Sequence, residues 1–221
     1  MSGADVSASS SVPVAAPLLV LNGVSKVYRR GLLRRTATFR LDVDLRFEQP
    51  AIVGVMGPNG AGKTTLFEMI AGSNVPSAGR VVVAGRDMQR IRYSERDRIA
   101  IHYHQSYQVR RFTRTRPDFM LQAPGSSYPV VHLFDEPQFN TQDGYIGFML
   151  DFFGRLRAEN RLVFVCLHPT AALHLQLLEE ICEAFVFVRS GQARRFASFA
   201  DMVAQDDVRT YLGALAPDAA V

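Results

Sequence analysis

The residues best suited to chemistry lie in a glycine-rich segment, Gly57-Pro-Asn-Gly-Ala-Gly-Lys-Thr64, which fits the pattern G-x-x-x-x-G-K-[ST]. Glycines let successive backbone N–H groups turn inward without Cβ clashes, and these groups surround phosphate oxygens together with the start of the next helix. Lys63 would reach the β- and γ-phosphates, and the Thr64 hydroxyl would ligate Mg²⁺. We therefore predict a nucleoside triphosphate site, with ATP and Mg²⁺ as the expected ligands. The expected binding residues are Gly57, Pro58, Asn59, Gly60, Ala61, Gly62, Lys63, Thr64 and Thr65.

Two adjacent acids follow a second apolar run, Val130-Val-His-Leu-Phe-Asp135-Glu136. Acids at the carboxyl end of a parallel strand lie where α/β sheets bind ligands. Asp135 would hold Mg²⁺, directly or through water. Glu136 would polarise the attacking water as a general base. A solvated acidic turn is the alternative, and the phosphate loop in the same chain argues against it.

Two further strand ends carry polar residues. The run Leu162–Leu167 ends at His168, which would contact the γ-phosphate, although a histidine after a strand often has a structural role. Ile99–Tyr103 is followed by Gln105, which could reach Mg²⁺ and the water. Gln108 is a possible substitute for Gln105.

The apolar patterns around these residues predict an α/β fold: a P-loop NTPase with a mostly parallel central sheet flanked by helices, plus an antiparallel β element at the N-terminal side. Phe39–Phe47 alternates apolar and charged residues, as a half-buried strand does, whereas Ala51–Met56 is a continuous apolar run. The further predicted strands are Leu18–Leu21, Arg80–Ala84, Ile99–Tyr103, Val130–Phe134, Leu162–Leu167 and Ala184–Val188. The predicted helices are Thr64–Ala71, Gly144–Arg157 and Ala171–Glu183.

Composition limits the class of protein. The 221 residues suit one domain, no apolar stretch is long enough for a transmembrane helix, and Met1–Ala16 lacks the pattern of a secretory signal. Cys166 and Cys182 form no CxxC pair, which favours a cytosolic protein with inert thiols. The net charge of +4 is gathered in two arginine groups. A solvated basic face explains them more simply than nucleic acid or anionic lipid, so we expect no specific nucleic-acid partner. The arginines are Arg29, Arg30, Arg34, Arg35, Arg110, Arg111, Arg114 and Arg116.

The order of these elements resembles the ATP-binding cassette of ABC transporters. Gly57–Thr65, GPNGAGKTT, is very similar to the family's Walker A, and Phe134–Pro137, FDEP, to its Walker B. The resemblance implies that Tyr28, in Val24-Ser-Lys-Val-Tyr28, stacks on adenine. It also makes Gln105 the Q-loop residue and His168 the H-loop residue, and Asp143 is a candidate D-loop aspartate. The expected domain covers 17–215, between a disordered tail at 1–16 and a flexible C-terminus at 216–221.

One part of the family pattern is missing. The family carries a helical subdomain and an LSGGQ signature between the Q-loop and Walker B, but only 29 residues separate Gln105 from Asp135 here, and no LSGGQ-like string occurs in the chain. We therefore expect a shortened helical region at about 106–129. Because the signature of one cassette caps the ATP of the other, this chain is expected to need a second ATP-binding cassette.

Three functions are compatible with these features. The first is the ATPase subunit of an ABC-type transporter, peripheral to the cytoplasmic face of a membrane and attached to a multi-span membrane transporter subunit. The second is a soluble ATP-dependent switch derived from such a cassette. The third, a small-molecule kinase, fits the Asp135–Glu136 pair and His168 less well.

Overall fold

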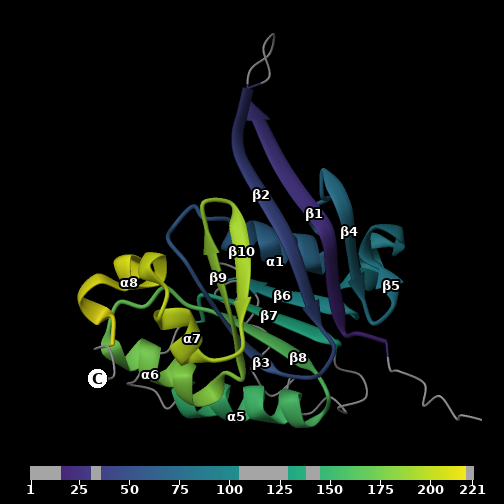
Figure 1. The fold of residues 1–221 in the computed structure, drawn as a ribbon. Helices are drawn as coiled ribbons and strands as arrows, with labels where there is room; N and C mark the ends of the chain where they lie inside the picture. The colour runs from purple at the N-terminus through teal and green to yellow at the C-terminus, as the bar shows by residue number, and fades with distance from the viewer. Residues whose placement is uncertain (1–15, 31–35, 105–128, 138–144, 218–221) are drawn as a thin grey trace, which may run out of the picture.

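The computed structural model describes residues 16–30, 36–104, 129–137 and 145–217 (Figure 1). Gln105, Gln108, Asp143 and most of both predicted tails lie outside these ranges, as does nearly all of the predicted shortened region at 106–129. The strands are β1 (Leu19–Arg30), β2 (Thr36–Phe47), β3 (Ile52–Met56), β4 (Ala78–Val83), β5 (Arg86–Asp87), β6 (Ala100–His104), β7 (Val131–Asp135), β8 (Leu162–Cys166), β9 (Ala184–Arg189) and β10 (Gln192–Phe196). The helices are α1 (Lys63–Ala71), η1 (Met88–Arg90), α2 (Tyr93–Arg96), α5 (Tyr145–Ala158), α6 (Ala172–Ile181), α7 (Phe199–Val203), α8 (Asp206–Leu212) and η3 (Gly213–Leu215).

Within these ranges the strands form one ten-stranded sheet in the order β5-β4-β1-β2-β10-β9-β3-β8-β7-β6. From β9 to β6 every neighbouring pair is parallel, and from β5 to β2 every pair is antiparallel. Strand β10 joins the two parts, since it pairs antiparallel with β9 and parallel with β2. The predicted α/β fold, with an antiparallel element at the N-terminal side, is confirmed.

The N-terminal hairpin is longer than its sequence pattern suggests. Strand β2 shows the predicted alternation, with Leu41, Val43, Leu45 and Phe47 buried. Strand β1, however, continues far beyond the predicted strand Leu18–Leu21. A register shift after Leu21 interrupts its pairing with β2, and such irregularities break the period of two on which strand prediction depends.

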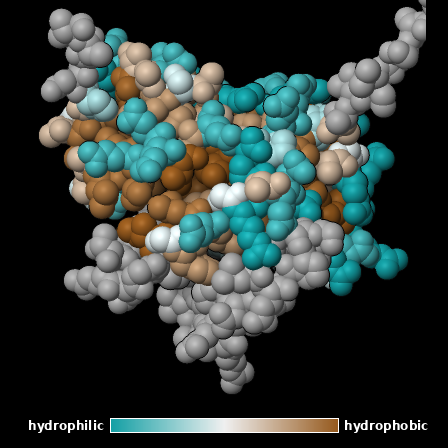
Figure 2. Space-filling model, turned by 90° about the horizontal axis from the view of Figure 1, so that it is seen from below, coloured by the Kyte–Doolittle hydropathy of each residue, from teal (hydrophilic) through white to brown (hydrophobic). Residues whose placement is uncertain are grey.

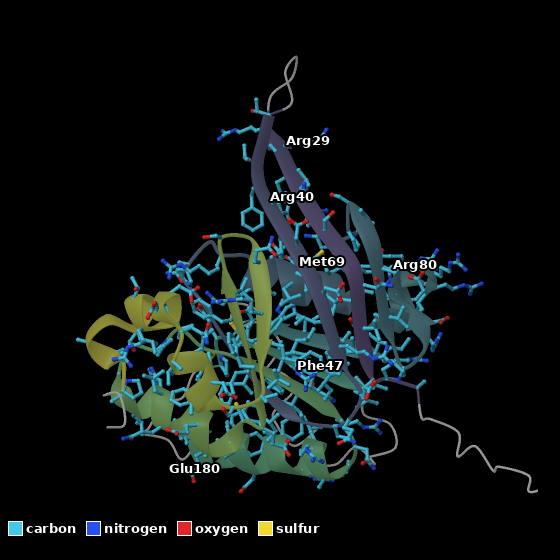
Figure 3. The ribbon with its side chains drawn as sticks, in the orientation of Figure 1. Arg29, Arg40, Phe47, Met69, Arg80 and Glu180 are labelled. Carbon is cyan, nitrogen blue, oxygen red and sulfur yellow. The ribbon has the colours of Figure 1, made fainter. Side chains whose placement is uncertain are left out.

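The two faces of the sheet bury separate cores. One core holds α1 against the antiparallel strands and one face of the parallel strands. The other holds α5, α6, α7 and α8 against the opposite face. In Figure 3, Met69 of α1 lies inside the molecule behind the hairpin, whereas Arg29 lies near the hairpin's outer end. The phosphate loop therefore emerges between two packed layers.

The surface seen from below is uneven. Hydrophobic residues gather on the left of Figure 2, the side on which α6 and α8 lie in Figure 1, and hydrophilic residues prevail on the right. Within the ranges that the structure describes, no helix combines the length and apolar character needed to cross a bilayer.

Candidate functional site

The glycine-rich loop connects β3 to α1 and depends on two unusual backbone conformations. Gly57 has φ +151°, and a Cβ there would lie 2.0 Å from the Val188 carbonyl oxygen of β9. Gly62, with φ +110°, precedes the first residue of α1 and packs against Phe39, where a Cβ would lie 2.9 Å from Cζ. The loop thus turns tightly over the sheet and brings the N-terminus of α1 to its edge, where backbone N–H groups favour an anion.

Lys63 is held against the loop that precedes it. Its side chain is buried, and Nζ donates to the carbonyl oxygens of Gly57, at 2.7 Å, and Pro58, at 3.0 Å. A buried ammonium is costly unless it is hydrogen-bonded, so these contacts fix it inside the loop. The arrangement supplies one positive charge at the place where the sequence predicts phosphate binding.

Thr64 and Asp135 meet at the edge of the parallel sheet. Thr64 Oγ1 donates to Asp135 Oδ2 at 2.8 Å, which joins the first turn of α1 to the end of β7. His102, on the neighbouring strand β6, places Nε2 at 3.5 Å from the same oxygen. Asp135 is only 4% exposed, and charged groups are rarely buried to this degree unless partners hold them.

Glu136 turns away from the strand that precedes it. Its φ is +52°, a left-handed conformation that non-glycine residues seldom adopt, and its N–H donates to the Cys166 carbonyl at 3.0 Å. Backbone strain of this kind, of order 1–3 kcal/mol, is often found at functional sites. Here the turn brings Glu136 to the pocket that the phosphate loop lines.

That pocket, of about 310 Å³, unites most of the predicted site. It begins at Tyr28 and Phe39 of the N-terminal hairpin, crosses the phosphate loop and reaches Glu136. Tyr28 is 38% exposed, so its ring is accessible to a ligand. The lining residues are Tyr28, Phe39, Asn59, Gly60, Gly62, Lys63, Thr64, Thr65 and Glu136.

His168 is placed differently. It follows β8 but does not line this pocket, and its Nδ1 lies 3.0 Å from the hydroxyl of Tyr211 on α8. Burial is the main cause that raises the pKa of Tyr211 to about 12, aided by the nearby Cys166 and Glu136 and opposed by the Gly57 backbone. His168 is therefore held by a tyrosine of α8.

Three side chains near the site were not predicted from the sequence. Phe39 fits the inward face of an alternating strand, and nothing in that pattern shows that the face continues into a pocket. His102 lies within an apolar strand run, and only the pairing of β6 with β7 brings it to Asp135. Tyr211 belongs to a short C-terminal helix that the sequence pattern does not indicate.

The donor set suits a small hard cation held jointly with phosphate. A threonine hydroxyl and one carboxylate are oxygen ligands, which Mg²⁺ prefers, and such sites leave the remaining positions to water and phosphate. In the described part of the chain, histidine, cysteine and carboxylate side chains do not gather in groups of three or more that could hold a metal unaided. Both thiols are buried, and burial raises the pKa of Cys166 and of Cys182, which disfavours thiolate ligands.

Comparisons with known proteins agree with this geometry. The profile of the ABC transporter family matches residues 41–163, more than half of the chain. A segment of 83 residues is 39% identical to the spermidine/putrescine import ATP-binding protein PotA of Thermobifida fusca, over 38% of this chain and 21% of that protein. A 70-residue segment is 46% identical to the methionine import ATP-binding protein MetN of Nocardia farcinica, over 32% of this chain and 20% of that protein. The chain spans only about a fifth to a third of the length of the curated relatives that it matches.

Solved structures show the same fold. A dimeric bacterial ABC transporter cassette aligns with a TM-score of 0.62 at 16% identity, over 81% of this chain and 98% of the cassette. At that identity the likeness shows the fold alone.

Proposed function

Because the chain belongs to the ABC transporter family, we propose that it binds ATP in the pocket between Tyr28 and Glu136 and hydrolyses it to ADP and phosphate. The observation that carries this proposal is the contact of Thr64 with Asp135, at 2.8 Å, since Thr64 lines the pocket together with Lys63 and Glu136. Phosphate loop, cation ligands and acid thus converge although they come from distant parts of the sequence.

The phosphates would be held by the backbone N–H groups of Gly57–Thr65 and by the Lys63 ammonium. Thr64 and Asp135 would hold Mg²⁺, with Gln105 as a further proposed ligand. When bound, Mg²⁺ would neutralise charge on the phosphates. The dipole at the N-terminus of α1 adds positive potential at the same place. These groups stabilise negative charge that increases as the terminal phosphate is transferred.

The attacking water would be positioned by Glu136. Its carboxylate accepts the proton of water as the new P–O bond forms in line with the bond to ADP. Glu136 suits this role because it lines the pocket, whereas Asp135 contacts Thr64. His168 would donate a hydrogen bond to the terminal phosphate.

Replacing Glu136 tests the assignment of the base. Glu136→Gln keeps the size of the side chain and removes its ability to accept a proton. We expect ATP affinity, measured by calorimetry with Mg²⁺, to be retained and phosphate release to fall about 10²–10⁴-fold. The matched control is Glu180→Gln on α6, an exposed position far from the loop in Figure 3, which should leave both quantities unchanged. Normal turnover of the Glu136→Gln variant excludes Glu136 as the base, and absence of ATP binding by the unmodified chain excludes the proposed function.

We further propose that the chain works as a peripheral subunit at the cytoplasmic face of a membrane, with a multi-span membrane subunit and a second ATP-binding cassette. The dimeric state of the structural neighbour and the lack of an LSGGQ-like string in this sequence support the need for a second cassette. The same missing string also favours the alternative, a soluble ATP-dependent switch. Affinity purification from cells separates the two, because recovery of a multi-span membrane protein supports transport and a soluble partner alone supports the switch.

A further inference from the structure

The C-terminal helix α8 reaches His168 through one side chain, that of Tyr211. Val208 and Leu212 are buried in the core beneath the helix. Asp207 fixes it from the other side, since Arg194 Nη2 donates to both carboxylate oxygens, at 2.7 and 2.6 Å. A helix held on two sides gives Tyr211 a defined position.

Tyr211 lies between two segments of the site. Its ring packs against Phe187 of β9, with ring centroids 5.6 Å apart, and its hydroxyl lies 3.0 Å from Nδ1 of His168. Among the described residues, this imidazole nitrogen is the hydrogen-bond partner of the Tyr211 hydroxyl. The tyrosine therefore joins α8, β9 and the loop after β8.

The direction of this hydrogen bond follows from the single proton of the hydroxyl. Among the described residues, His168 Nδ1 is the acceptor within hydrogen-bond distance of that hydroxyl, so the Tyr211 proton is directed to His168 Nδ1. A neutral imidazole that accepts at Nδ1 carries its proton at Nε2. We propose that Tyr211 is a positioning residue that holds His168 in the Nε2–H tautomer, with Nε2 available to donate to the terminal phosphate.

The catalytic role of Tyr211 rests on the proposed function, whereas the tautomer of His168 can be tested without it. In the opposite tautomer Nε2 would present a lone pair to phosphate oxygens and repel them. Tyr211 would therefore act on the chemical step through His168, without touching the nucleotide. Loss of a single neutral hydrogen bond is typically worth about 1 kcal/mol, or roughly a fivefold change in rate.

The tautomer can be read directly. The full chain, labelled with ¹⁵N-histidine, is examined by long-range ¹H–¹⁵N NMR at pH 8, well above the ordinary histidine pKa of about 6.5. The His168→Gln variant identifies the signals of His168. We expect Nε2 protonated and Nδ1 unprotonated in the unmodified chain, and a mixture of both tautomers in Tyr211→Phe, which keeps the ring and removes the hydroxyl. A protonated Nδ1 in the unmodified chain, or unchanged tautomers in Tyr211→Phe, overturns the proposal.

The catalytic consequence is measured separately. Tyr211→Phe should lower kcat about fivefold while the Kd for ATP changes less than twofold. Tyr93→Phe is the matched control, because Tyr93 is exposed on α2 and should leave tautomer and kcat unchanged. An equal loss in kcat and affinity contradicts a role confined to His168. If the unmodified chain shows no hydrolysis, the proposed function fails while the NMR result still decides the tautomer.

Discussion

Two aromatic residues on paired strands form the outer wall of the pocket. Tyr28 and Phe39 are register partners on β1 and β2, with ring centroids 6.0 Å apart and planes inclined by 46°. Asn74 Nδ2 donates to the Tyr28 hydroxyl at 2.7 Å, and Lys26 Nζ lies 5.3 Å from the ring centroid. The ring is thus fixed in place while part of its surface stays accessible, as a stacking platform for a nucleobase requires.

Replacing Tyr28 should weaken binding of the base and spare binding of the phosphates. Stacking on an aromatic ring is worth about 1–3 kcal/mol, so Tyr28→Ala should raise the Kd for ATP roughly 5- to 150-fold, whereas Tyr28→Phe should stay close to the unmodified value. Inorganic triphosphate, which has no base, separates the two effects, and its Kd should not change. If Tyr28→Ala weakens triphosphate as much as ATP, the side chain supports the loop and does not stack.

The same residues show how far the sequence can predict a site. The phosphate loop was predictable because its motif is contiguous in the sequence and its glycines meet a local backbone requirement, φ +151° at Gly57 and φ +110° at Gly62. Asp135 and Glu136 were predictable as acids at a strand end. Phe39 and Tyr211 were not, because their place in the site results from tertiary pairing, of β1 with β2 and of α8 with the loop after β8.

At the scale of elements, β7 carries a buried histidine on the strand that ends at Asp135, the proposed Mg²⁺ ligand. His132 is 1% exposed, with Nδ1 at 3.2 Å from the Tyr103 hydroxyl and Nε2 at 3.1 Å from the Pro129 carbonyl. Burial lowers the pKa of His132 to about 3. The strand is therefore built around a neutral imidazole, and burial disfavours its protonation.

This burial predicts a pH dependence of stability. Between the unfolded histidine pKa of about 6.5 and the folded value of about 3, the unfolded chain binds a proton that the native chain does not, so stability falls as pH decreases. The stability that the neutral, buried His132 contributes is fully present above pH 6.5. Below pH 6.5 it decreases by about 1.4 kcal/mol per pH unit, which is roughly 2 kcal/mol between pH 7 and pH 5.

Urea unfolding at the two pH values measures the effect. His132→Gln, whose amide can both donate and accept, should be less stable at pH 7. The difference in its free energy of unfolding between pH 7 and pH 5 should lack the part due to His132. His174→Gln on α6 is the control, in which that difference should be unchanged. An unchanged pH difference in His132→Gln shows that other groups cause it.

The predictability of elements follows their burial. The apolar runs that became β3, β7 and β8 were recognised because all their residues are buried. Strand β10, Gln-Ala-Arg-Arg-Phe, has no such signal, since it is polar and largely exposed and is held by β9. Helices α7 and α8 have five and seven residues, too few for a helical period to stand out, and their stability comes from packing.

At the scale of the whole molecule, the pocket combines residues of the N-terminal hairpin, the phosphate loop and the turn after β7. No LSGGQ-like string is present in the sequence to cap a second nucleotide. A pair of identical chains would lack the signature at both sites. The expected working unit is therefore a pair with a complete cassette.

This arrangement predicts slow hydrolysis by the isolated chain. Turnover per molecule should increase when a complete cassette is added, because the partner then supplies the groups that close over the nucleotide. The control is the same partner mixed with the Glu136→Gln variant, in which this chain's contribution to phosphate release is lost. Rates typical of complete cassettes from the isolated chain, unchanged over a wide range of protein concentration, contradict obligate pairing.

The attachment of the N-terminal hairpin separates recognition of the nucleobase from the chemistry at the phosphates. The hairpin that carries Tyr28 and Phe39 meets β10 and its turn through the register pair of Gln192 with Asp42 and two hydrogen bonds. One runs from the Asp42 N–H to the Gly191 carbonyl at 2.7 Å, and the other from Arg195 Nη1 to the Arg46 carbonyl at 2.9 Å. The phosphate chemistry is assigned to residues outside that hairpin. On this assignment, the residues that determine nucleobase preference and those that determine turnover are encoded by different stretches of the gene. Substitutions that change the choice of base can accumulate in the hairpin while the hydrolytic residues remain untouched.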